Sequence, residues 1–176
     1  MSLTGSPMAL ASTRIQCLLL VTTCWTITAC GLTGPSAGQL ATYYQSPEGS
    51  AEWKKDEERL AETAKAAANK FHGAKTVEAL TAYEKAVRDY LDHGFLLYRV
   101  LDASDSPFPK GFRTSLEHRA LELMDIADEY LKLGVSDVVA VDIARTVIHK
   151  YSVGRMDRAQ RRAEGILMQY RYQRNY

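Results

Sequence analysis

The stretch "TSLEHRALELMDIADEYLKLG" (residues 114–134) decides the fold class. Apolar side chains recur in it every three or four residues, which is the spacing of one face of an α-helix. Its first four residues have the pattern of a capping box, and Gly134 is a suitable helix stop. We therefore expect a helix that opens at Thr114 and ends before Gly134. Its predicted core face is Leu116, Ala120, Leu123, Met124, Ala127 and Tyr130.

The same spacing predicts two helices before this stretch and two after it. The first runs from Ser50 to a break at Gly73, and the fourth is capped by Ser136. No strand-like alternation competes with these patterns, so the predicted fold is all-α, with about five helices in residues 51–176. The remaining core positions are predicted to be Trp53, Leu60, Ala64, Ala67, Phe71, Val77, Leu80, Val87, Leu91, Phe95, Tyr98, Leu101, Ala140, Ile143, Ala144, Val147, Tyr151, Ala159, Ala163, Ile166, Leu167 and Tyr170.

One segment resembles a tetratricopeptide unit. In "IADEYLKLGVSDVVAVDIARTVIHKY" (residues 126–151), Tyr130 and Gly134 lie four apart, as the first helix and turn of that family require. Ala140 comes one residue later than the usual spacing, and Ala144 stands where a larger aromatic is more common. The resemblance implies a short array of paired helices. A simple helical bundle is the alternative, and the residues leave both open.

Composition describes one domain with an uneven charge distribution. The chain has 176 residues and a net charge of +1, so its overall charge does not favour binding to nucleic acid. Residues 48–142 contain thirteen Lys and Arg against nineteen Asp and Glu, whereas residues 145–176 contain eight against two. The body is acidic and the tail is basic.

All three cysteines lie in the first thirty residues, at Cys17, Cys24 and Cys30. With no cysteine downstream, a disulfide framework or zinc site is not expected. Arg14 precedes the short apolar run "IQCLLLVTTCWTITAC" (residues 15–30), which is the layout of a secretory signal whether the chain starts at Met1 or Met8. That run is too short to predict a membrane-spanning helix.

The end of this run, "ITAC" (residues 27–30), resembles the lipobox of bacterial lipoproteins. The resemblance implies a diacylglycerol on the Cys30 sulfur, cleavage before Cys30 and acylation of the new N-terminus. The absence of Asp at position 31 further implies sorting to the outer membrane, with the domain facing the periplasm. An ordinary signal peptide or an uncleaved anchor is the alternative.

The next twenty residues, "GLTGPSAGQLATYYQSPEGS" (31–50), carry a single charge and are rich in Gly, Ser, Thr and Pro. Such composition is typical of a flexible tether. The predicted organisation is a signal peptide over 1–29, a lipidated tether over 30–50 and a helical domain over 51–176.

No catalytic or metal-binding pattern emerges from the sequence. The four histidines, His72, His93, His118 and His149, do not have the spacing of metal ligands. "GILMQY" (residues 165–170) is similar to a motif of lytic transglycosylases, but no Glu-Ser pair accompanies it. We therefore expect no enzyme, no metal and no cofactor.

Two segments are candidate partner-binding surfaces. The loop "DASDSPFPKGF" (residues 102–112) holds Phe108 between prolines, which restrict the backbone, and places Phe112 nearby. The alternative is that both rings cover helix ends. The tail (residues 157–176) interleaves basic and aromatic residues, and its alternative is docking on the acidic body of the same chain. Its candidate residues are Arg158, Arg161, Arg162, Tyr170 and Tyr172.

These patterns predict a lipid-anchored, periplasm-facing adaptor of a bacterial envelope machine for secretion, conjugation or outer-membrane assembly. The plan resembles that of outer-membrane assembly and secretion-system lipoproteins. The expected partners are an envelope protein complex and the membrane, close to peptidoglycan, and no nucleic acid. A pilotin-like chaperone or a surface-exclusion lipoprotein is the alternative, and a cell-wall enzyme comes third.

Overall fold

The computed structural model describes residues 35–135, 137–151 and 156–174, with side chains as far as Tyr170. All regular structure in these residues is helical, which confirms the all-α prediction. The helices are α2 (Ala37–Gln45), α3 (Pro47–Ala74), α4 (Val77–Ala103), α5 (Phe112–Lys132), α6 (Asp137–Lys150) and α7 (Asp157–Arg174).

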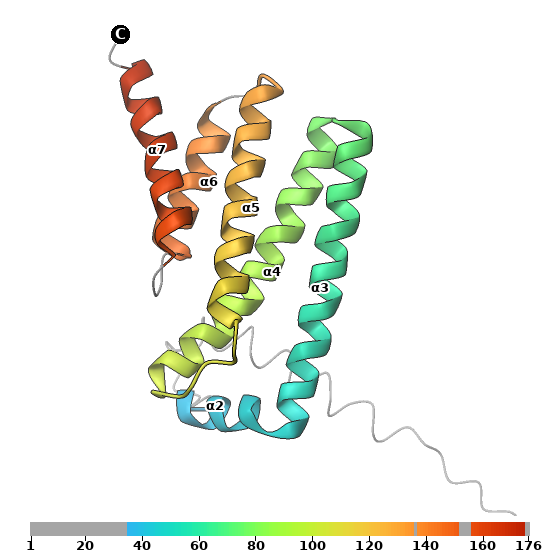
Figure 1. Cartoon of the computed structure of the whole chain (residues 1–176), viewed down its shortest axis with the longest axis vertical. Coiled ribbons are helices and arrows are strands. Elements are labelled where there is room, and N and C mark those ends of the chain that lie inside the picture. The colour runs from blue at the N-terminus through green and yellow to red at the C-terminus, as the bar shows by residue number, and fades with distance from the viewer. Residues whose placement is uncertain (1–34, 136, 152–155, 175–176) are drawn as a thin grey trace, which may run out of the picture.

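The long helices run up and down side by side (Figure 1). Helices α3 and α4 form an antiparallel hairpin, α4 packs on α5, and α6 and α7 follow on the far side of α5. The short α2 crosses one end of this row and packs on both α3 and α4. Helix α4 therefore lies at the centre, in contact with α2, α3 and α5.

The helix α2 corrects the predicted tether. Residues 37–45 and 47–50 are helical, with Ala41 buried, so the expectation of a flexible segment over 30–50 is wrong from residue 37 onward. Ser36 and Gln39 form a reciprocal capping box at the start of α2. The expected signal peptide, Cys30 and the first residues of the tether lie outside the described residues.

Two predicted helix boundaries move by about a turn or less. Helix α3 passes through Gly73 and ends at Ala74, and its C-cap residue Lys75 adopts a left-handed conformation with φ 49°. Helix α5 begins at Phe112 rather than Thr114, because Gly111 at φ 78° provides the N-cap position. The predicted stop at Gly134 is confirmed: its φ is 70°, and the Val135 N–H donates to the Tyr130 carbonyl at 3.0 Å.

The predicted core stripes of α4, α5 and α6 are buried, with one exception. Val77 is 40% exposed, because it is the first residue of α4 at the tip of the hairpin. Helices α4 and α5 approach closely at Gly94, where an added Cβ would lie 2.3 Å from Leu116 Cδ2. Helix α3 contributes less to the core, with Ala64 and Phe71 as its buried apolar side chains.

Buried tyrosines link the helices through hydrogen bonds to carboxylates, and each of these bonds involves α4. Tyr83 donates to Glu122 of α5. The other three run from Tyr90 to Glu57 of α3 at 2.7 Å, from Tyr130 of α5 to Glu84 at 2.9 Å, and from Tyr151 to Asp92 at 2.6 Å. Burial, followed by the bonded carboxylate, raises the pKa of Tyr83, Tyr90 and Tyr151.

These bonds predict a loss of stability at alkaline pH. Burial raises the pKa of Tyr130 to about 12, with a further contribution from Glu84. The unfolded chain releases this proton near pH 10, so the stabilisation is complete below about pH 10 and is lost as the pH rises towards about 12. We expect Tyr130→Phe to lower the free energy of unfolding by about 1.5–3 kcal/mol at neutral pH. The variant should also lose less stability than the wild type over the alkaline interval, as measured by urea denaturation.

Tyr43→Phe is the matched control, because Tyr43 also bonds to a carboxylate but is 42% exposed. It should change the free energy of unfolding by less than about 0.5 kcal/mol. Equal effects of the two variants would contradict a structural role for the buried bond.

Candidate functional site

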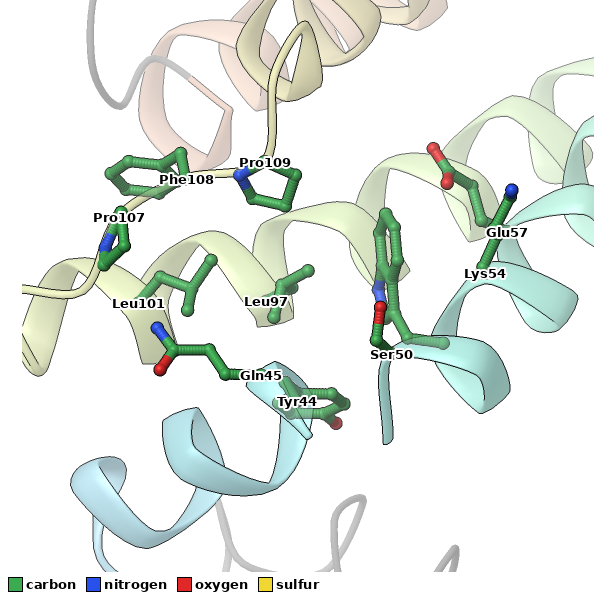
Figure 2. Close-up of a pocket in the computed structure, with 11 residues that line it drawn as sticks. Tyr44, Gln45, Ser50, Lys54, Glu57, Leu97, Leu101, Pro107, Phe108 and Pro109 are labelled. Carbon is green, nitrogen blue, oxygen red and sulfur yellow. The ribbon is translucent and has the colours of Figure 1, made fainter. Parts of the chain in front are cut away.

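A groove of about 410 Å³ opens between α2, α3, α4 and the loop formed by residues 104–111. Figure 2 shows Pro107, Phe108 and Pro109 on one side, Tyr44 and Gln45 of α2 on the other, and Leu97 and Leu101 of α4 between them. We call this the α2 groove. Its lining residues are Tyr44, Gln45, Ser50, Trp53, Lys54, Glu57, Leu97, Leu101, Pro107, Phe108 and Pro109.

The corner between α2 and α3 sets the position of one wall. Ser46 ends α2 and its side chain caps α3, and Pro47 is the first residue of α3, where a proline is tolerated. Gly49 packs directly on α2, since an added Cβ would lie 2.1 Å from the Tyr43 carbonyl oxygen. The corner thus requires glycine at this position and fixes Tyr44 beside α3.

The opposite wall is held by stacking around Phe108. Its ring stacks on Tyr98 of α4 with centroids 4.8 Å apart. The Arg113 guanidinium lies 4.4 Å from the centroid of the Phe108 ring, within the range of a cation–π interaction. With prolines on both sides of Phe108, the loop loses little further entropy when a ligand binds.

Trp53 connects this wall to α3. Its ring meets Phe112 edge-on, with centroids 5.6 Å apart, and stacks on His93 of α4 at 5.5 Å. Burial lowers the pKa of His93. Among the described residues, the buried Nε1 of Trp53 and Nε2 of His93 have no hydrogen-bond partner. The result is a row of ring contacts from Phe108 through Phe112 and Trp53 to His93, which supports the groove from behind.

The rim carries polar groups. Burial, with smaller contributions from Glu52 and Asp56, raises the pKa of Tyr44, so its phenol stays protonated at neutral pH. Glu57 accepts a hydrogen bond from Tyr90, whereas Lys54 is exposed and forms no ion pair with another described residue. The rim can therefore offer a ligand hydrogen bonds, the positive charge of Lys54 and the negative charge of Glu57.

The two phenylalanines predicted as partner anchors lie in different environments. Phe108 is half-buried and lines the groove. Phe112 is only 5% exposed, so its expected role as a surface anchor is wrong. As the first residue of α5, it points into the core against Trp53 and supports the wall from behind.

The basic tail docks in part on the acidic body. Arg162 of α7 forms ion pairs with Asp125 and Asp128 of α5, each at 2.5 Å. Arg158 and Arg161 have exposed side chains, and the Arg161 Nε donates to the Asp157 carbonyl at 3.0 Å.

Tyr170, the one aromatic residue of the tail whose side chain the structure describes, lies apart from the α2 groove. Tyr170 lines a second hollow of about 370 Å³ between the ends of α5, α6 and α7. The side chain of Tyr172 lies outside the described part of the chain. The two segments predicted to bind partners, the loop and the tail, therefore lie in different parts of the structure.

Four residues that shape the groove were missed as site residues: Tyr44, Trp53, Leu97 and Leu101. Tyr44 was assigned to the tether, although "SAGQ" (residues 36–39) has the capping-box pattern and Leu40 and Tyr44 have helical spacing. Trp53 and Leu101 are predicted core positions, because periodicity does not tell a core face from the wall of a groove. No role is predicted for Leu97.

Comparison of the chain with protein-family models, curated proteins and solved structures found no match. Within the described ranges, no three His, Cys, Asp or Glu side chains come together as a metal site would require. None of the helices from α2 to α7 is both long and apolar enough to cross a membrane.

The ion pairs of the tail generate a stability prediction. Arg162→Glu would place three carboxylates together, so we expect the free energy of unfolding to fall by about 1 kcal/mol. Arg161→Glu is the matched control and should change it by less than about 0.5 kcal/mol. Urea denaturation of both variants measures the difference between their free energies of unfolding. If Arg161→Glu is the more damaging change, the tail does not dock through Arg162.

Proposed function

We propose that this protein is a lipid-anchored helical adaptor of a bacterial envelope machine, and that it binds a protein partner through the α2 groove. The observation that carries the proposal is the groove itself, an apolar concavity with aromatic walls and a polar rim. Binding sites for protein segments have this composition, because apolar surface provides affinity and a few polar groups orient the ligand.

The groove is suited to an extended segment of a partner that inserts an apolar side chain. Leu97 and Leu101 form an apolar floor, and Phe108 and Tyr44 offer rigid aromatic surface, which is enriched among residues that dominate binding energy. Lys54 on the rim favours a segment with a carboxylate next to its apolar anchor. We propose that the protein acts by binding rather than by catalysis.

The anchor is the second part of the proposal. The lipobox-like "ITAC" places Cys30 ahead of the helical domain, and acylation there would hold the domain at a membrane. Several buried acyl chains make such attachment effectively permanent, since each methylene contributes about 0.8 kcal/mol. Gly31 in place of Asp supports the outer membrane as the destination and the periplasm as the working compartment.

The anchor predicts the behaviour of a Cys30→Ser variant. Without the thiol no lipid can be attached, and a lipoprotein signal peptidase acts only after lipidation, so the precursor should accumulate. Globomycin should produce the same precursor from the wild type. Mass spectrometry of the mature wild type should find an acylated N-terminus at Cys30. A mature N-terminus elsewhere, or one without lipid, would remove the lipoprotein assignment.

The groove predicts position-specific contact with a partner. A photo-crosslinking amino acid in place of Gln45, an exposed residue of the rim, should give an adduct with one envelope protein, identified by mass spectrometry. Phe108→Ala should reduce that adduct severalfold, because it removes a wall of the groove. The same photo-crosslinker at Met168, an exposed apolar residue of α7, is the control and should not give it.

Thermal melting of Phe108→Ala shows whether the domain remains folded. A folded Phe108→Ala variant with an unchanged adduct would overturn the groove as the binding site. Equal adducts from positions 45 and 168 would do the same.

A further inference from the structure

Helix α2 lies close to the proposed lipid anchor. Only residues 31–36 separate Cys30 from Ala37, the first residue of α2. Even a fully extended chain spans at most about 3.6 Å per residue, so α2 would begin within about 25 Å of the acylated sulfur. The twenty-residue tether expected from the sequence would have allowed about 70 Å.

The surface of α2 is free of charge. No Asp, Glu, Lys, Arg or His occurs between Ile15 and Pro47, and Glu48 is the first charged residue after α2 begins. The inner side of the helix packs through Ala41. The outer side of the helix carries the exposed residues Gln39, Thr42 and Tyr43, the last of which is 42% exposed. Tyrosine is enriched where membrane meets water, and α2 itself carries no charge that has to be dehydrated there. Tyr43 donates a hydrogen bond to Glu52 of α3, which places that carboxylate at the edge of the face.

Helix α2 also lies at one end of the molecule. Figure 1 shows it crossing the open end of the α3–α4 hairpin, with the last turn of α7 at the opposite end of the molecule. The tip of the hairpin, near Ala74, is as far from α2 as the length of α3 allows. Helix α3 has 28 residues and is about 42 Å long at 1.5 Å per residue.

We propose that the exposed face of α2 rests on the bilayer surface and that the domain stands on it. The inference depends on the proposed lipidation of Cys30. In this orientation the hairpin tip projects about 40 Å from the membrane. The α2 groove opens beside the bilayer, since α2 is one of its walls. The segment bound there would then belong to the membrane-adjacent part of a partner.

The chain offers a clean way to test this orientation. In the mature lipoprotein, cleavage removes Cys17 and Cys24, and the Cys30 sulfur is blocked as a thioether. A single introduced cysteine is then the only free thiol. Thr42→Cys places a fluorophore on the exposed face of α2, and Ala74→Cys places it at the hairpin tip; both positions are exposed, so labelling should preserve the fold.

The full lipidated protein is reconstituted into vesicles of phosphatidylethanolamine and phosphatidylglycerol, with and without brominated lipid as a short-range quencher. We expect brominated lipid to quench most of the fluorescence at position 42 and to leave position 74 unchanged. Because α2 is uncharged, high salt should not release the contact. Equal quenching at the two positions, or loss of quenching in salt, would overturn the proposal.

Mass spectrometry of the same sample separates this inference from the function on which it rests. An unlipidated Cys30 would overturn both. A lipidated Cys30 without quenching at position 42 would overturn only the contact of α2 with the membrane.

Discussion

The hydrogen bonds between buried tyrosines and carboxylates set the geometry on which the rest of this structure depends. A phenol buried without a partner destabilises the folded state, and a carboxylate resists full burial. Each of the four bonds satisfies the phenol inside while its carboxylate stays near the surface. Because every bond has α4 at one end, this helix is held in register with α3, with α5 and with Tyr151 at the end of α6.

The α2 groove depends on this central position of α4. Leu97 and Leu101 form its floor only because α4 continues past α5 towards α2, beyond the last of the tyrosine bonds. The walls are held by other means: the Gly49 corner fixes α2, and Tyr98 and Arg113 hold Phe108. A site built on such fixed parts would lose little conformational freedom when a ligand binds, which is consistent with the proposed adaptor role.

Charge has a different role in the two halves of the molecule. On α7, Arg162 is used within the chain, where it holds the basic tail to Asp125 and Asp128 of the acidic body. At the other end, α2 has no charge at all. A helix without charged residues near a lipid anchor would allow α2 to contact the membrane while the charged surface of the rest of the domain remains in water.

The sequence by itself determined the class of fold and most of the core. The spacing of Leu116, Leu123 and Tyr130 fits an α-helix that buries the face on which they lie. Gly134 stops that helix as expected. Local patterns also contained the capping box of α2, although the composition of the segment pointed to a tether. Only the tertiary structure decided which apolar residues became core and which became the groove. Phe108 and Phe112 stand in one loop with similar surroundings in sequence, and the start of α5 at Phe112 turned one ring into the core and left the other at the surface. Periodicity specifies the face of a helix that is apolar, but what covers that face depends on where distant helices lie.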